Sequence, residues 1–151
     1  MSFKMTDKIS LILCESGRPF GERVLEHLRP LCEVDNIPLS LSHTQETWFK
    51  NKEVKTIIKE PIRGDDVYII QLLNDPLSER SVNDNFIALL TAIDAAHQSD
   101  AGRITLIIPQ FPYARQERRK EREGITAKLA SRFMEEVGGE RIITIDIHAE
   151  A

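Results

Sequence analysis

Short, almost continuously apolar segments alternate along this chain with longer segments of helical periodicity. Four of the apolar segments are Ile9–Cys14, Asp66–Gln71, Arg103–Ile108 and Arg141–Ile147. Strands buried on both faces show this pattern, whereas a strand with one solvated face alternates apolar and polar residues. The sequence therefore predicts an α/β fold with a mostly parallel sheet that is flanked by helices.

Helical spacing of apolar residues predicts three helices, over residues 20–31, 81–96 and 126–137. Pro30 is expected to end the first helix, and Ser81 or Asn83 to cap the second. Weaker strand patterns cover Pro38–Ser42 and Glu53–Lys59, the latter expected at a sheet edge.

Composition limits the kind of protein. A length of 151 residues fits one domain, and a net charge of -4 argues against general nucleic-acid binding. The two cysteines, Cys14 and Cys32, are too few for a disulfide framework. The sequence shows neither a signal peptide nor an apolar run that could span a bilayer, so we expect a cytoplasmic protein without a membrane partner.

A cationic segment follows the strand that Pro109 closes. Arg115 presents a planar fork that matches phosphate oxygens, Gln116 is suited to an adenine edge, and Phe111 or Tyr113 could flank a base. The alternative is a solvated helix start in which residues 117–122 pair at helical spacing. The position favours a ligand site, because ligands of parallel α/β sheets bind at the carboxyl ends of strands.

Asp146 and His148 end the last predicted strand. Residues two apart on a strand face the same side, so both could serve one Mg²⁺ ion, with His148 acting directly or through water. The alternative is a strand-end histidine bonded to backbone. The sequence contains no Walker loop and no G-x-G-x-x-G, so phosphate binding must rest on side chains and other turns. Because this strand lacks a following helix, we expect a longer natural protein.

These segments resemble the amino-terminal half of the ribose-phosphate pyrophosphokinase family. The resemblance covers most of the chain from Phe49 onward and is most specific in Phe-Pro-Tyr-Ala-Arg-Gln and Asp-Ile-His-Ala. The matching segments, in the family's order, are Arg63–Gln71, Asn83–Asn85, Ser99–Thr105, Ile108–Gln116, Ile125–Lys128 and Ile143–Ala149.

The resemblance implies a phosphoribosyltransferase-like domain, one of two in tandem, with residues 1–151 as the amino-terminal one. The family transfers the diphosphoryl group of ATP, with Mg²⁺, to the 1-hydroxyl of ribose 5-phosphate and forms dimers within hexamers. This half alone is expected to be inactive. The implied ATP-binding residues are Arg115, Gln116 and Arg118, with Phe49 and Glu53 in a neighbouring subunit's base pocket; the implied metal residues are His148 and Asp146.

Three departures from the family pattern bear on function. The family's F-x-D-G-E is here Phe49-Lys-Asn51-Lys52-Glu53, which loses a carboxylate and a glycine; for the two aromatics at 48 and 49, core packing is the alternative to a base pocket. Gly124 stands where a proline is usual, and Ala88 replaces a helix carboxylate. A non-catalytic, nucleotide-binding associated subunit therefore stays open, as does, more weakly, a phosphoribosyltransferase.

Overall fold

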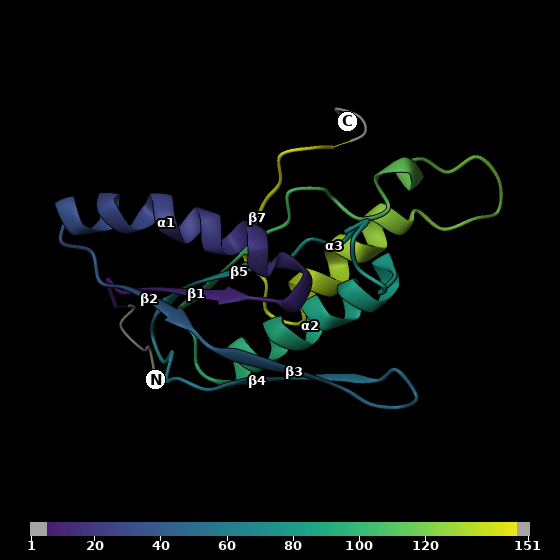
Figure 1. Ribbon diagram of the computed structural model, residues 1–151. Helices are drawn as coiled ribbons and strands as arrows, with labels where there is room; N and C mark the ends of the chain where they lie inside the picture. The colour runs from purple at the N-terminus through teal and green to yellow at the C-terminus, as the bar shows by residue number, and fades with distance from the viewer. Residues whose placement is uncertain (1–5, 148–151) are drawn as a thin grey trace.

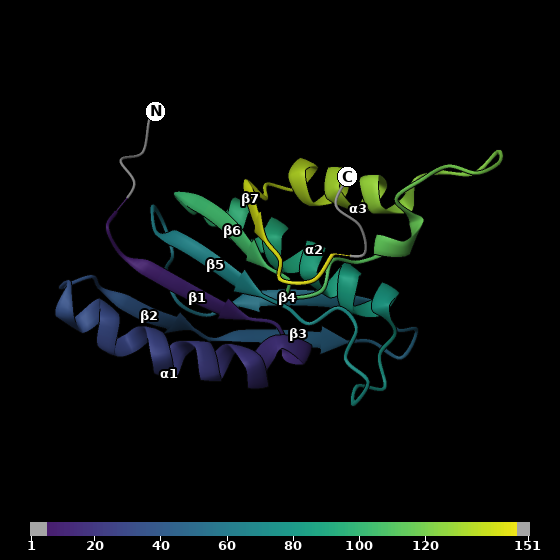
Figure 2. The same cartoon turned by 90° about the horizontal axis from the view of Figure 1, so that it is seen from above.

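The computed structural model describes residues 6–147, and its centre is a five-stranded sheet in which every pair is parallel. The strand order is β2-β1-β5-β6-β7; Figure 1 shows the whole chain, and Figure 2 shows the five strands side by side. This confirms the α/β fold with a mostly parallel sheet. The strands are β1 (Ile9–Leu13), β2 (Leu39–Ser42), β5 (Asp66–Ile70), β6 (Arg103–Ile107) and β7 (Arg141–Ile143).

Helices cover both faces of the sheet. Helix α1 (Arg18–Val34) lies on one face, and α2 (Val82–Gln98) and α3 (Thr126–Glu136) lie on the other (Figure 2). Ser81 is the N-cap of α2, because its hydroxyl accepts from the Asp84 amide while the Asp84 carboxylate accepts from the Ser81 amide. The main core lies between the sheet and α2, and includes Val67, Ile69, Leu89, Ile93 and Leu106.

One expectation about the helices was wrong. Pro30 does not end α1, which continues to Val34. The proline removes one backbone hydrogen bond on an exposed side, while Cys32 beyond it is buried and holds the last turn against the protein. In α3 the fully buried residues are Ala130 and Met134, while Leu129 and Phe133 are nearly half exposed.

A β-hairpin that the sequence patterns only half revealed connects β2 to β5. Strands β3 (Thr44–Trp48) and β4 (Val54–Ile58) form a separate antiparallel sheet. The hairpin packs along α2, where the hydroxyls of Thr56 and Thr91 lie 2.9 Å apart. Strand β4 is an edge strand, as expected, but of this separate two-stranded sheet. Its partner β3 has a polar sequence that gave no strand signal.

The last predicted strand is shorter than expected. Strand β7 stops at Ile143, and Asp146 rejoins β6 only through an isolated bridge to Gln110. The break has a local cause, since Pro109 has no amide hydrogen and its carbonyl accepts from both Ile145 and Asp146. The expectation that Asp146 and His148 lie on one continuous strand and face the same side is therefore wrong at Asp146. His148 lies outside the described residues.

The topology defines where a ligand can enter. The connection after β1 leads to β2 at one edge, whereas the connection after β5 leads toward β6 and the opposite edge, so the order reverses between β1 and β5. The short 3₁₀ helix η1 (Glu15–Gly17) follows β1, and a Cβ on Gly17 would lie 2.5 Å from the Ile70 carbonyl oxygen. No helix within the described part of the chain is long and apolar enough to cross a membrane.

Candidate functional site

A crevice of about 410 Å³ opens beyond the carboxyl ends of β5, β6 and β7. We call it the turn crevice. Its walls come from the segments that follow each of these strands, so it forms only when the sheet is assembled. Its lining residues are Leu73, Asn74, Val82, Gln110, Phe111, Pro112, Tyr113, Ala114, Arg115, Gln116 and Asp146.

Arg115 and Gln116 lie on the 3₁₀ helix η2 (Ala114–Gln116) and are exposed to solvent. The Gln116 amide donates to the Tyr113 carbonyl over 2.8 Å, which closes the turn. An exposed guanidinium and an exposed carboxamide at the mouth of a crevice are suited to phosphate oxygens and to a base edge. The structure thus places both predicted residues in the lining of the turn crevice.

Tyr113 begins this turn in the left-handed region, with φ 56° and ψ 24°. Such a backbone costs a residue with a side chain roughly 1–2 kcal/mol, so other contacts must hold it. The Tyr113 ring meets the Phe86 ring edge-on, with centroids 5.9 Å apart, and its hydroxyl donates to the Asn83 side-chain oxygen. Phe111 and Tyr113 line the crevice, but both rings also pack on the core.

Asp146 also lines this crevice, with an exposed side chain. Its backbone is fixed by the bridge to Gln110, because the Phe111 amide donates to the Asp146 carbonyl and the Asp146 amide to the Pro109 carbonyl. The backbone of Asp146 is therefore fixed to the segment that follows β6, and its side chain lines the same crevice as Arg115. A cation and an anion in one crevice can bind a metal-bound polyphosphate from two sides.

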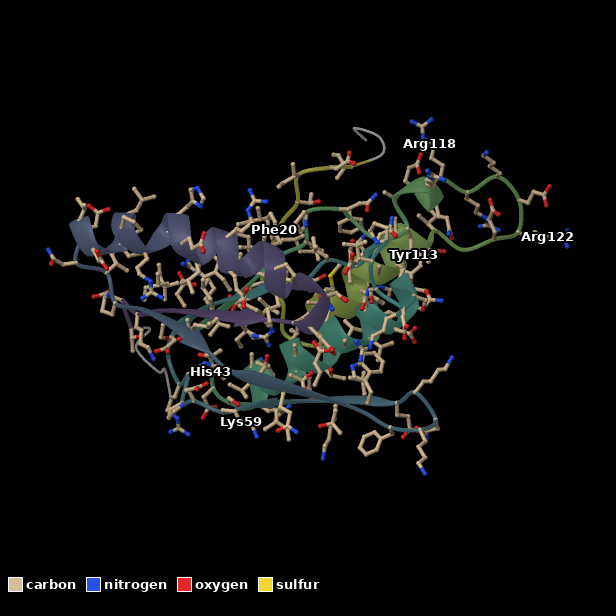
Figure 3. The ribbon with its side chains drawn as sticks, in the orientation of Figure 1. Phe20, His43, Lys59, Tyr113, Arg118 and Arg122 are labelled. Carbon is tan, nitrogen blue, oxygen red and sulfur yellow. The ribbon has the colours of Figure 1, made fainter. Side chains whose placement is uncertain are left out.

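Arg118 lies outside this lining, at the start of an exposed loop that extends to Gly124. Figure 3 shows Arg118 and Arg122 pointing away from the body of the protein. Residues 117–124 are all described and form no helix, so the alternative of a solvated helix start with paired charges is wrong. Within the described segment between β6 and α3, helical geometry is confined to the three-residue turn that carries Arg115.

Among the residues that line the turn crevice, one carboxylate, that of Asp146, could bind a metal ion. Among residues 6–147, no group of three or more histidine, cysteine, aspartate or glutamate side chains is placed to hold a metal ion. Mg²⁺ usually binds through one or two carboxylates together with substrate phosphates and water. Asp146 supplies such a carboxylate, so the residues present fit a Mg²⁺ ion that arrives with a nucleotide.

A second crevice, of about 560 Å³, lies near the point where the strand order reverses, and we call it the hairpin crevice. It is walled by the end of β3, by η1 and by the loop before α2. Phe49 lines it with 46 % of its surface exposed, whereas Glu53 is exposed outside the lining. Its lining residues are Glu15, Ser16, Trp48, Phe49, Lys52, Asp75, Ser78, Glu79, Arg80 and Asp84.

Charged groups fasten the hairpin beside this crevice. The Arg80 guanidinium lies 4.1 Å from the centre of the Trp48 ring, and its Nη1 is 2.9 Å from the Glu15 carboxylate. Glu46 accepts from the Glu15 amide over 2.6 Å and from the Trp48 indole over 3.3 Å. Burial raises the pKa of Glu46 above the ordinary glutamate value, and these two hydrogen bonds oppose the shift only in part.

The two departures at the hairpin tip lie in the turn between β3 and β4. Lys52 has φ 68°, the left-handed geometry for which the family's glycine is suited. The tip closes through a hydrogen bond from the Lys52 amide to the Phe49 carbonyl. Phe49 and Glu53 therefore lie on a protruding hairpin and do not line the turn crevice.

Sequence reasoning missed two residues with evident roles in this geometry, Arg80 and Asn83. Arg80 lies in an irregular loop, where no periodicity signals a partner. Asn83 was considered as a cap, whereas its oxygen accepts from Tyr113, which is 30 residues away. Neither pairing is visible without the fold.

Comparison with known proteins identifies clear relatives. Residues 9–138 match the family model described as the N-terminal domain of ribose phosphate pyrophosphokinase. A ribose-phosphate pyrophosphokinase of Vibrio parahaemolyticus is 44 % identical over 119 residues, which are 78 % of this chain and 36 % of that protein. A putative ribose-phosphate pyrophosphokinase 2 of Listeria innocua is 37 % identical over 96 % of this chain and 42 % of that protein.

A solved structure agrees with these relatives. The crystal structure of phosphoribosylpyrophosphate synthetase from Mycobacterium smegmatis superposes with a TM-score of 0.82 at 26 % identity, covering 95 % of this chain and 44 % of that one. The chain thus spans less than half the length of the relatives it matches. The resemblance and the fold inferred from sequence are confirmed.

Proposed function

Because this chain belongs to the ribose phosphate pyrophosphokinase family as its amino-terminal domain, we propose that it supplies the ATP side of a ribose-phosphate diphosphokinase. The full enzyme transfers the diphosphoryl group of ATP to the 1-hydroxyl of ribose 5-phosphate and releases AMP. The chain covers less than half the length of its relatives. We therefore place the sugar-phosphate site in the other half and expect this chain alone to be inactive.

The observation that carries the proposal is the meeting of Arg115, Gln116 and Asp146 in the turn crevice. Arg115 binds phosphate oxygens of ATP, Gln116 bonds the adenine edge, and Arg118 contacts phosphates from the adjoining loop. Asp146, with His148, holds the Mg²⁺ ion, which neutralises phosphate charge when it is bound. Phosphoryl transfer needs little covalent work from the protein, so positioning and charge neutralisation are the main tasks of these side chains.

The protruding hairpin supports a homo-oligomeric assembly, with dimers inside a hexamer as in the family. Phe49 is nearly half exposed at the hairpin tip, where it can reach a base bound to a neighbouring subunit. Glu53 is exposed beside it. The free thiols of Cys14 and Cys32 fit a reducing compartment, and we assign the protein to the cytoplasm.

Calorimetry with Mg-ATP on the chain tests this proposal. Arg115→Ala should weaken binding by about 1.5–3 kcal/mol, the scale of a hydrogen bond to a charged group. Arg132→Ala, at an exposed position on α3, is the matched control and should leave affinity unchanged. Equal affinities for wild type and Arg115→Ala would remove the turn crevice from ATP binding. Phosphorus NMR with ribose 5-phosphate should show no AMP.

A second function, a non-catalytic associated subunit that binds nucleotide, is favoured by the hairpin tip. Asn51 and Lys52 replace the family's carboxylate and glycine, and Lys52 keeps the left-handed backbone that suits glycine. An assay of the full-length gene product with Mg-ATP and ribose 5-phosphate distinguishes the two functions. AMP and a sugar 1-diphosphate formed together indicate the enzyme, whereas ATP that is bound but unreacted indicates the associated subunit.

A further inference from the structure

Asn83 and Tyr113 connect the Arg115 turn to the first turn of α2. Asn83 is the second residue of that helix, and Phe86 follows three residues later on the same side. The Tyr113 ring contacts Phe86, and its hydroxyl extends to Asn83, so one side chain touches both residues. Figure 3 places Tyr113 at the base of the exposed loop, next to α2 and α3.

The residue that makes this contact also begins the turn that carries Arg115. Tyr113 has the left-handed backbone that starts the 3₁₀ turn, and its carbonyl accepts from the Gln116 amide. Arg115 lies between these two residues and is exposed. The first residue of this short turn is thus anchored by its own side chain, which is partly buried against the core cluster.

We propose that Asn83 and Tyr113 are positioning residues for the nucleotide: their hydrogen bond holds the Arg115–Gln116 turn in the geometry that binds ATP. This inference rests on the proposed function, because it assumes that the turn crevice takes ATP. Neither side chain is required to touch the nucleotide. Without the hydrogen bond, Tyr113 can move out of the left-handed conformation and the turn becomes disordered. ATP binding must then order the turn again, which weakens the observed affinity.

The first test is Mg-ATP affinity, measured by calorimetry on three chains. Tyr113→Phe keeps the ring on Phe86 and removes only the hydroxyl, and it should weaken binding about five- to tenfold, the scale of one hydrogen bond. The chain has one other tyrosine, Tyr68, whose hydroxyl donates to Asp66 within β5. Tyr68→Phe is the matched control and should bind like the wild type.

Substitutions at Asn83 separate positioning from general stability. Asn83→Ala should weaken binding as Tyr113→Phe does, and the double variant should be no weaker than either single one, because both remove the same bond. Asn83→Asp keeps an acceptor oxygen and should restore near-wild-type affinity. Additive losses, or an Asn83→Asp variant as weak as Asn83→Ala, would overturn the inference.

Limited trypsin digestion without nucleotide tests the same point independently. Cleavage after Arg115 should be faster in Tyr113→Phe and Asn83→Ala, whereas cleavage after Arg122, in the exposed loop, should not change. Equal cleavage rates after Arg115 in all variants would overturn the inference. Failure of the wild-type chain to bind Mg-ATP would overturn the proposed function, and the digestion would then decide the positioning role alone.

Discussion

The turn crevice and the hairpin crevice lie along the carboxyl ends of the same sheet but are held by different forces. The turn that carries Arg115 is fastened by aromatic packing, because Tyr113 sits edge-on against Phe86 and joins the core. The hairpin is fastened by charged groups, with Arg80 between the Trp48 ring and the Glu15 carboxylate. Ring packing, together with one hydrogen bond, holds the first region, whereas charged groups hold the end of the hairpin in the second.

Each region also contains a non-glycine residue with a left-handed backbone. At Tyr113 the strain is opposed by a ring contact and a hydrogen bond to α2. At Lys52 the side chain is exposed, and the geometry follows from the tight turn between β3 and β4. The same left-handed backbone therefore has two different causes. Contacts that are distant in sequence stabilise it at Tyr113, and the short hairpin turn requires it at Lys52.

Arg80→Ala tests whether charged groups hold the hairpin. It removes both the stack on Trp48 and the ion pair with Glu15, so it should lower the free energy of unfolding by about 1–2 kcal/mol. Trp48 is the only tryptophan of the chain, so its emission should shift to longer wavelength as the ring becomes exposed. Urea unfolding followed by fluorescence measures both effects in one experiment.

Arg23→Ala is the control for this measurement, because Arg23 is exposed on α1. It should change neither the emission maximum nor the unfolding free energy by more than about 0.5 kcal/mol. If Arg80→Ala unfolds like the wild type with unchanged Trp48 emission, the hairpin is held by its packing on α2 instead, and the contrast between the two crevices disappears.

Lys52→Gly tests the second half of the comparison. The substitution relieves left-handed strain of about 1–2 kcal/mol. Glycine adds chain entropy to the unfolded state, which costs about 0.5–1 kcal/mol. The variant should therefore be more stable by roughly 0.5–1 kcal/mol. The measurement is the urea midpoint at constant m-value. Lys50→Gly, nearby and without a left-handed backbone, should instead be neutral or destabilising; a gain at both positions would contradict the strain argument.

The parallel sheet and its helices could be predicted because buried strands and amphipathic helices leave periodic patterns in the sequence. Strand β3 could not, since Thr44-Gln-Glu-Thr-Trp48 is polar and gains its strand geometry by pairing with β4. The early end of β7 also escaped prediction. Its cause is Pro109, which follows the neighbouring strand and which the pattern of β7 itself does not contain.

The candidate site was predicted in part for a similar reason. Arg115, Gln116 and Asp146 follow strands, so the topology alone brings them to one edge of the sheet. The residues that hold the geometry, Arg80 and Asn83, act through partners that are distant in sequence, and only the fold reveals them.

Glu46→Gln is expected to change the free energy of unfolding least, and it tests the charged contacts that hold the hairpin. Burial raises the pKa of Glu46 in the folded protein, so unfolding releases a proton where the unfolded chain's carboxyl is already ionised. The wild type therefore loses stability as pH rises from the ordinary glutamate pKa to the raised one. The substituted glutamine side chain keeps an acceptor for the Glu15 amide without this charge.

The stability difference between Glu46→Gln and wild type should therefore increase in favour of the variant as pH rises from about 4 toward 7. Subtracting the wild-type stability from that of the variant at each pH cancels the contributions of the other acids. One of these is Asp84, whose hydrogen bonds with Ser81 lower its pKa and give the opposite pH dependence. Urea unfolding at several pH values, followed by Trp48 emission, measures it. A constant or shrinking difference would mean that Glu46 is ionised in the fold at no cost, with Arg80 and the Glu15 amide offsetting its burial.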